Sequence, residues 1–143
     1  MYILGTLILF GMTPLAIAQI TVEHYKVTGY GQFDNRPANI QLSGTVESWP
    51  TYDFDLGKVT AREYKYSGRI QNTSLSLDFS YSGTQLDDYF HGVIKSNPIT
   101  SVEVSIRYDG ATSTNYLQIW MWDRDYTRTF EIGRFQVVFE KVE

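Results

Sequence analysis

Cysteine is absent from this chain of 143 residues, and proline and histidine are scarce, with four and two copies. Without cysteine the chain has no disulfide, no thiolate metal site and no cysteine nucleophile. The folded domain must therefore be held together by core packing. Basic tracts are missing as well, since 12 Lys and Arg stand against 16 Asp and Glu, for a net charge of −4. Such a mildly acidic chain is a poor partner for nucleic acid.

Charge is also missing from the N-terminus, where Glu23 is the first charged residue. The apolar run YILGTLILFGM is short for a membrane span, and TPLAIA after it places small residues at Ala16 and Ala18. This pattern predicts a secretory signal peptide over residues 1–18 and a single extracellular domain over 19–143, with no membrane span in the mature chain. Because no Lys or Arg precedes the apolar run, a retained membrane anchor is the alternative.

Apolar residues alternate with polar ones over most of the remaining sequence. Val102, Val104 and Ile106 occupy every second position, and so do Phe135 and Val137. This alternation is typical of a strand with one buried face. Turn-forming residues separate about eight such segments, near residues 20–32, 38–47, 60–70, 74–82, 89–95, 101–108, 115–123 and 128–141. The sequence therefore predicts an all-β antiparallel fold, either a sandwich or a barrel.

The stretch GYGQFDNRPANIQL, residues 29–42, looks at first like a glycine-rich phosphate loop. A dinucleotide fingerprint needs a third glycine and a following helix, and neither is expected here. Gly29, Gly31 and Phe33 instead share one face of a strand, and a turn at DNRPAN leads to the next strand. We interpret the two glycines as allowing a bulge or a close approach by another backbone.

Short motifs near both ends of the mature chain occur in an order and at a spacing similar to those of a known protein family. They comprise Val27, Gly29, Pro37 and Ala38, then IRYDG at 106–110, and TFEIGRFQVVFEKVE at 129–143 with Gly133. These motifs resemble those of the nematode transthyretin-like family. The resemblance implies a transthyretin-like antiparallel β-sandwich of about seven to eight strands, secreted from the cell. It also implies a carrier or recognition role towards hydrophobic small molecules, lipids or cell-surface partners, and edge strands through which a homo-oligomer can form.

The chain departs from the family pattern at several positions. Phe33 and Gly110 stand where the family has cysteines, which is consistent with loss of a bridge, and Tyr108 replaces a histidine. Hydrolases of the transthyretin fold use histidines, an arginine and a C-terminal Tyr-Arg-Gly-Ser, whereas this chain ends in Phe-Glu-Lys-Val-Glu. His24 and His91 are the two candidate bases, on separate predicted strands. We expect no enzyme and no cofactor, with a hydrolase on this fold as the alternative.

Paired aspartates at two predicted turns offer a candidate metal site. Asp53 and Asp55 form one pair, and Asp123 and Asp125 form the other, with Arg124 between them. If both turns lie at one end of the fold, four carboxylates can bind Ca²⁺ and reach an anionic membrane. The plainer interpretation is that Asp is common in turns because its side chain bonds nearby backbone. We expect no metal, and keep calcium-assisted membrane binding as a further alternative.

Aromatic residues cluster in YLQIWMWDRDY. Tyr116, Trp120 and Trp122 fall on one face of the predicted strand, opposite an aliphatic face that is expected to enter the core. The indoles either pack against a neighbouring strand or form a platform that binds a ligand or partner, with Arg124 adding cation–π contacts. The sequence thus favours a secreted, non-enzymatic binding protein for a hydrophobic small molecule, a lipid or an extracellular protein. The sequon at Asn72 predicts a glycan on an exposed loop.

Overall fold

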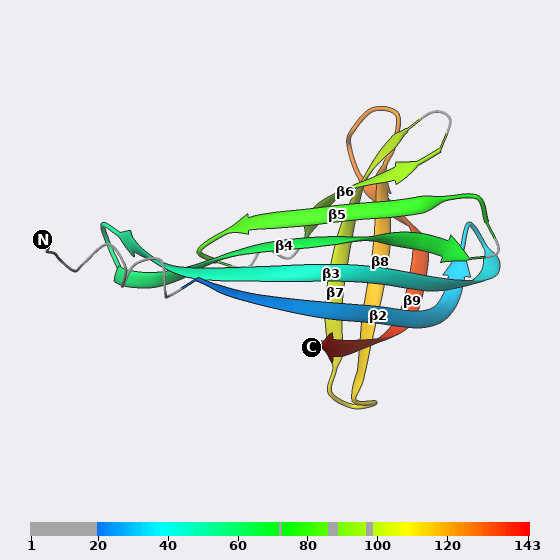
Figure 1. Ribbon diagram of the computed structural model, residues 1–143. Coiled ribbons are helices and arrows are strands. Elements are labelled where there is room, and N and C mark those ends of the chain that lie inside the picture. Colours follow the sequence, from blue (N-terminus) through cyan, green and yellow to red (C-terminus); the bar gives the residue numbers. More distant parts are fainter. Residues whose placement is uncertain (1–19, 72, 86–88, 97–98) are drawn as a thin grey trace, which may run out of the picture.

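A computed structural model describes residues 20–71, 73–85, 89–96 and 99–143. Strands account for most of this part of the chain, and strand labels follow Figure 1. The strands are β2 (Thr21–Phe33), β3 (Arg36–Asp53), β4 (Gly57–Gln71), β5 (Ser76–Gly83), β6 (Phe90–Lys95), β7 (Thr100–Asp109), β8 (Thr114–Trp122) and β9 (Thr129–Val142). All eight predicted segments are confirmed as strands. The predicted signal peptide, residues 1–18, and the predicted glycan site, Asn72, lie outside the described residues.

The eight strands form one closed antiparallel barrel. Each strand pairs with its neighbour in sequence, and β9 pairs with β2 from His24↔Val142 to Phe33↔Gly133. In Figure 1, β2 to β5 run across the view and β7 to β9 cross them steeply. The all-β antiparallel prediction is confirmed, but the predicted open sandwich is wrong. The long β2–β9 ladder is the reason, because it joins the first strand to the last and leaves no gap between two sheets.

Two glycines on the inward face of β2 allow β9 to approach closely. A Cβ atom at Gly29 would lie 2.1 Å from the carbonyl oxygen of Gln136, and one at Gly31 would lie 1.9 Å from that of Arg134. Both distances are far below van der Waals contact, so a side chain at either position is incompatible with this ladder. The prediction that these glycines allow a close approach by another backbone is confirmed. A phosphate loop is excluded, because the segment after the glycines is a strand and not a helix.

The connection between β2 and β3 is a tight hairpin turn. Phe33 pairs with Arg36, which leaves Asp34 and Asn35 as the two loop residues. Their φ angles are 53° and 62°, and such positive values at both positions are typical of a type I′ turn, which Asn and Asp tolerate. The turn is shorter than the predicted DNRPAN because Pro37 already lies in β3, near the start of the strand.

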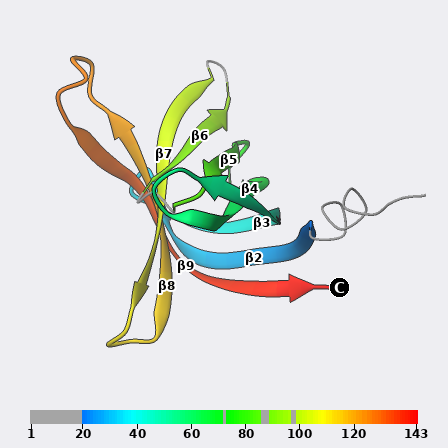
Figure 2. The same ribbon diagram turned by 90° about the vertical axis from the view of Figure 1, so that its left-hand side faces the viewer.

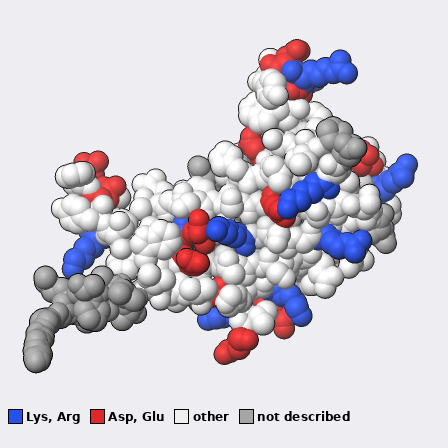
Figure 3. All heavy atoms as spheres, turned by 45° about the horizontal axis from the view of Figure 1, so that its top comes forward, with Lys and Arg blue, Asp and Glu red and all other residues white. Residues whose placement is uncertain are grey.

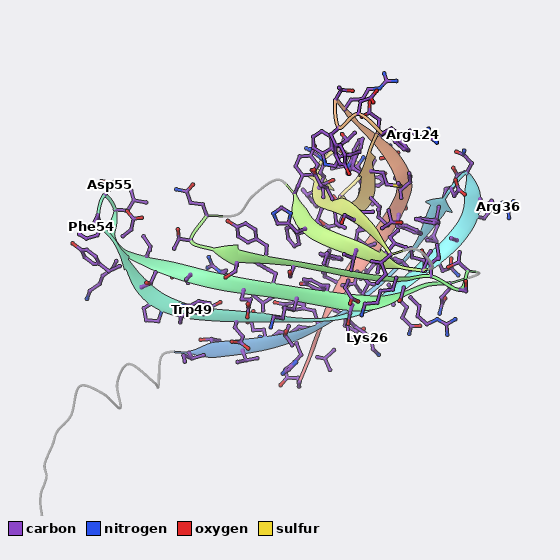
Figure 4. The ribbon with its side chains drawn as sticks, turned by 90° about the horizontal axis from the view of Figure 1, so that it is seen from above. Lys26, Arg36, Trp49, Phe54, Asp55 and Arg124 are labelled. Carbon is purple, nitrogen blue, oxygen red and sulfur yellow. The ribbon has the colours of Figure 1, made fainter. Side chains whose placement is uncertain are left out.

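The hairpin of β3 and β4 extends beyond the rest of the barrel. The segment predicted at 38–47 ends before Pro50, yet β3 continues through Pro50 to Asp53. Pro50 pairs with Thr60 of β4, whereas the pairing of β2 with β3 stops at Ser48, so no described strand pairs with the other edge of β3 at this point. A proline is tolerated on such an edge. We call residues 49–61 the overhang, and Figure 4 shows Phe54 at its tip, away from the barrel.

Side chains fill the barrel interior at one end, which we call the closed end. The connections at this end are β2–β3, β4–β5, β6–β7 and β8–β9. We call the other end, with the overhang, the open end. Figure 2 shows the β7–β8 and β8–β9 connections on opposite sides of the molecule. The largest fully buried apolar side chains are Phe135, Ile40, Leu42, Ile70, Leu77, Leu117, Ile119, Val27 and Val104. They come from seven of the eight strands, and most of them lie in the half of the barrel next to the closed end.

We expect Gly31→Ala to destabilise the fold by about 3 kcal/mol, because the added methyl group clashes with the β9 backbone. Gly110→Ala is the matched control, since its Cβ would lie 3.9 Å from the nearest atom, and we expect it to change stability by less than about 0.5 kcal/mol. Urea unfolding of the two variants measures the difference. Equal unfolding midpoints would show that the β2–β9 approach does not hold the barrel closed.

Candidate functional site

The open end of the barrel contains a cavity of about 680 Å³, which we call the mouth cavity. It is lined by Thr21, Glu23, Tyr25, Val46, Ser48, Arg62, Tyr64, Tyr66, Phe90, Ile106, Arg107 and Phe139. Except for Arg107, these residues lie on the inward-facing register positions of β2, β3, β4, β6, β7 and β9. The cavity exists because the buried aliphatic side chains fill the other half of the interior.

Aromatic rings form the wall and floor of the mouth cavity. Tyr66 stacks on Phe79 with ring centres 5.2 Å apart, and Phe90 lies 5.4 Å from Phe79. Tyr64 lies 5.7 Å from Phe90, and Phe139 meets Tyr66 edge-on. Strand alternation produces this wall, because each residue occupies an inward position of its strand. The rings hold one another in place, so the wall is largely formed before any ligand arrives.

Two phenol groups in this wall, those of Tyr64 and Tyr66, have no hydrogen-bond partner among the described residues. Tyr66 is almost fully buried, and neither its hydroxyl nor that of Tyr64 makes a hydrogen bond within the described part of the chain. Burial raises the pKa of Tyr66 to about 12, so the phenol stays protonated at neutral pH. No fully enclosed side-chain polar atom of the described residues lacks a partner, so the hydroxyl of Tyr66 is not fully enclosed, and Tyr66 lines the mouth cavity. The floor of the cavity therefore offers a neutral hydrogen-bond donor.

The rim of the mouth cavity is charged. The ammonium group of Lys141 donates to Glu23 over 3.1 Å, and the hydroxyl of Tyr25 donates to the same carboxylate over 3.1 Å. The bond from Lys141 is the main reason that the pKa of Glu23 is lowered, and the same contact raises the pKa of Lys141. Arg62 also lines the rim, but it makes no hydrogen bond or ion pair with any residue in the described ranges.

A second hollow, of about 850 Å³, lies over the outer face of β3 to β7. Ser43, Thr45, Ser67, Ser80 and Ser101 contribute to it, together with Lys65, Asp78 and His91. These small hydroxyl side chains point towards solvent, whereas the mouth cavity is enclosed by rings from within the barrel. The mouth cavity is therefore the better candidate for a small-molecule site.

The predicted aromatic platform lies on the outer face of the barrel. Leu117 and Ile119 are fully buried, which confirms that the aliphatic face of β8 enters the core. Tyr116, Trp120 and Trp122 face outward, with Trp122 43% exposed and the other two half-buried. Their role in binding a ligand or partner stays a prediction. Arg124, on the β8–β9 connection, is exposed and has no ring contact within the described part of the chain.

Both indoles are tied to neighbouring strands by hydrogen bonds. The Trp122 indole donates to Glu103 over 2.9 Å, and the Trp120 indole donates to Ser105 over 3.2 Å. Ser105 in turn donates to Gln118, and Gln118 donates to Glu131. Ser105 and Gln118 are buried although they face outward. The outer face of β7 to β9 thus carries a connected polar network that has the Trp120 indole as one of its members.

The four candidate metal-binding aspartates lie at opposite ends of the barrel. Asp53 and Asp55 belong to the overhang at the open end, whereas Asp123 and Asp125 follow β8 at the closed end (Figure 1). The condition for a four-carboxylate calcium site is therefore not met. Asp53 accepts hydrogen bonds from the backbone amides of Asp55 and Leu56, the usual role of Asp in a turn. No group of three or more metal-ligating side chains occurs among the described residues.

The carboxylate of Asp123 holds the β8–β9 connection together. It accepts from both the hydroxyl and the backbone amide of Thr127, at 2.7 Å and 2.8 Å, and these bonds lower its pKa. Arg128 lies 3.8 Å from the same carboxylate. The acidic group is therefore already engaged in forming the loop.

The two histidines lie far apart on the outer surface. His24 is exposed on β2, and His91 is exposed on β6. His91 is the ladder partner of Ser80, but no hydrogen bond joins their side chains. Within the described ranges neither imidazole has a hydrogen-bonded nucleophile. A hydrolase site therefore stays a prediction, and among the described residues no catalytic set of side chains is assembled around either histidine.

The two positions at which the resembled family has cysteines are far apart. Phe33 ends β2 at the closed end, and Gly110 follows β7 at the open end. No disulfide could join side chains placed in this way. The resemblance to the nematode transthyretin-like family stays a prediction.

The described residues contain no helix that is long and apolar enough to cross a bilayer. No protein-family model matches the chain, and neither does any curated protein or any solved structure. The candidate site is therefore argued from its geometry.

Sequence reasoning missed the mouth cavity. Its aromatic residues are scattered as single letters over the chain, in contrast to the compact cluster YLQIWMW. Tyr25, Tyr64 and Tyr66 each follow the strand alternation, which assigns them to the inward face. Alternation does not give the register between neighbouring strands. This register places Tyr64 beside Val46 of β3 and Tyr81 of β5.

We expect Trp120→Ala to cost about 2 kcal/mol of stability, because it opens the polar network and removes a half-buried ring. Trp122→Ala should cost less than about 1 kcal/mol, since its ring is more exposed. Thermal unfolding distinguishes the two variants. If Trp122→Ala alone unfolds the domain, the indole is a core residue and the outward placement is wrong.

Tyr66 should titrate well above a tyrosine that is free in water. The unfolded chain releases this phenol proton near pH 10, whereas the fold retains it to about pH 12. The free energy of unfolding should therefore fall as the pH rises from 10 towards 12, and Tyr66→Phe should remove that part of the fall. Ultraviolet titration of tyrosinate and urea unfolding at pH 9 and pH 11 measure both effects. An unchanged pH dependence in Tyr66→Phe would contradict the assignment.

Proposed function

We propose that this protein binds one small, largely apolar molecule in the mouth cavity and does no chemistry on it. An eight-stranded barrel has an interior just wide enough to be filled by side chains or to hold one small ligand. Here the closed end is filled, and the open end has about 680 Å³ of free space. That volume falls within the range of small-molecule sites, which occur often in the mouths of β-barrels.

The observation that carries this proposal is the unfilled, ring-lined half of the barrel. Five aromatic side chains line it, and four of them, Tyr64, Tyr66, Phe90 and Phe139, contact one another or Phe79. An apolar ligand placed there removes ring surface from water, which contributes about 25 cal/mol per Å². The Tyr66 phenol adds one hydrogen-bond donor that can orient the ligand.

The overhang supports the same function through its position. Tyr52, Phe54 and Leu56 are 70%, 98% and 62% exposed, so an apolar surface stands at the open end, beside the cavity. Trp49 belongs to the same overhang, as Figure 4 shows. An apolar molecule leaving water meets this surface at the end of the barrel where the cavity opens.

The outer aromatic face is a second candidate site for recognition. Trp122 is 43% exposed and Tyr126, on the following connection, is 77% exposed. Together with the half-buried ring of Tyr116 they offer a partner an aromatic surface. Secretion of the chain, a role as hydrolase and calcium-assisted membrane binding remain predictions from the sequence.

A neutral dye whose fluorescence depends on polarity, such as Nile red, tests the mouth cavity directly. We expect the dye to bind with a blue-shifted, enhanced emission, and we expect Ile106→Trp to weaken binding at least about tenfold by filling the cavity. Val138→Trp is the matched control, because Val138 is 66% exposed on the outer face of β9. Circular dichroism checks that both variants are folded.

Dye binding that survives Ile106→Trp would contradict the proposal. If Trp122→Ala weakened binding instead, the outer aromatic face would be the site. Absence of any dye binding to the folded wild type would remove the mouth cavity from consideration.

A further inference from the structure

Arg62 stands at the rim of the mouth cavity without a counter-charge. It occupies an inward position of β4, two residues before Tyr64. Its ladder partners are Ser48 of β3 and Gly83 of β5, and neither carries a charge. No ion pair or hydrogen bond engages its side chain anywhere in the described part of the chain. This guanidinium group therefore has donors to spare at the entrance of an apolar cavity.

The other charges of the rim do not neutralise Arg62. Glu23 is the acid that lines the cavity, and it is engaged by Lys141 over 3.1 Å and by Tyr25. Counting Arg62, Arg107, Lys141 and Glu23, the rim keeps two net positive charges, although the whole chain carries −4. Acidic and basic side chains are interspersed over the face that Figure 3 shows. The positive charge of the rim is therefore local and is not part of a larger basic surface on that face.

We propose that the ligand of the mouth cavity is an anionic amphiphile, whose acidic head group is bound by Arg62 at the rim while its apolar part lies against the rings. This inference rests on the binding function proposed above and adds the chemical class of the ligand. Guanidinium donors fit a carboxylate in a two-point arrangement, and such charge-assisted bonds are stronger than neutral ones. An unbranched chain leading from the head group would pass Tyr64 and end near Tyr66 and Phe90.

A matched pair of ligands tests the class. Dodecanoate and dodecanol share the same apolar chain and differ in the charge of the head group. We expect the wild type to bind dodecanoate about tenfold more tightly than dodecanol, measured by displacement of Nile red. The preference should weaken as the salt concentration rises, because the rim is exposed to solvent.

Arg62→Gln should lower the affinity for dodecanoate about tenfold and leave that for dodecanol unchanged. Arg62→Lys should keep part of the preference, since it retains the charge but not the planar fork. Arg69→Gln is the control, because Arg69 lies on the same strand at an exposed, outward position, and it should keep the wild-type preference.

The outcomes separate the two proposals. If dodecanol binds and dodecanoate binds no better, the anionic class is wrong and the cavity remains a neutral apolar site. If Arg62→Gln keeps the preference, Arg62 does not bind the head group and this inference is wrong. If neither ligand displaces the dye from the folded wild type, both proposals fall. A loss of preference in Arg69→Gln as large as in Arg62→Gln would show that general surface charge, rather than the rim, attracts the acid.

Discussion

The contact on which this structure depends is the ladder between β2 and β9. It joins strands that are more than a hundred residues apart, and it removes the free edges that an open sheet would have along these strands. The backbones can meet because Gly29 and Gly31 have no side chain where β9 passes. In a chain without cysteine, this closure and the core that it encloses replace the cross-links on which many small secreted domains rely.

Closure also determines where a ligand can bind. A closed barrel of eight strands has a fixed width, so its interior is filled or hollow according to the side chains that point inward. Large aliphatic residues fill the half near the closed end. Towards the open end, rings contact one another along the wall, and Val46 and Ser48 are small, so space remains. The cavity is thus a consequence of side-chain sizes along the inward positions.

Local features of the fold follow from the sequence, and the closure does not. Alternation gives the strands to within a few residues, as for 89–95 against Phe90–Lys95. It fails at 47–53, because a proline is compatible with a strand whose outer edge is free, and Pro50 lies beyond the end of β2. Sandwich and barrel share the same alternation. The pairing of β2 with β9 distinguishes the barrel from the sandwich. In the sequence, an inward glycine that permits this pairing cannot be told from a glycine at a β-bulge.

The site was harder to predict because the aromatic residues that line it are scattered along the sequence, whereas other aromatic residues are clustered. The indoles of Trp120 and Trp122 are adjacent in the chain and attract attention, yet their N–H groups are already bound to Ser105 and Glu103. A ligand on that face gains ring contact without a new hydrogen bond from either indole. Among the residues that the structure describes, the phenol of Tyr66 has no such partner. A ligand in the mouth cavity would gain both ring burial and a hydrogen bond, and for this reason we propose the scattered tyrosines, rather than the clustered tryptophans, as the binding surface.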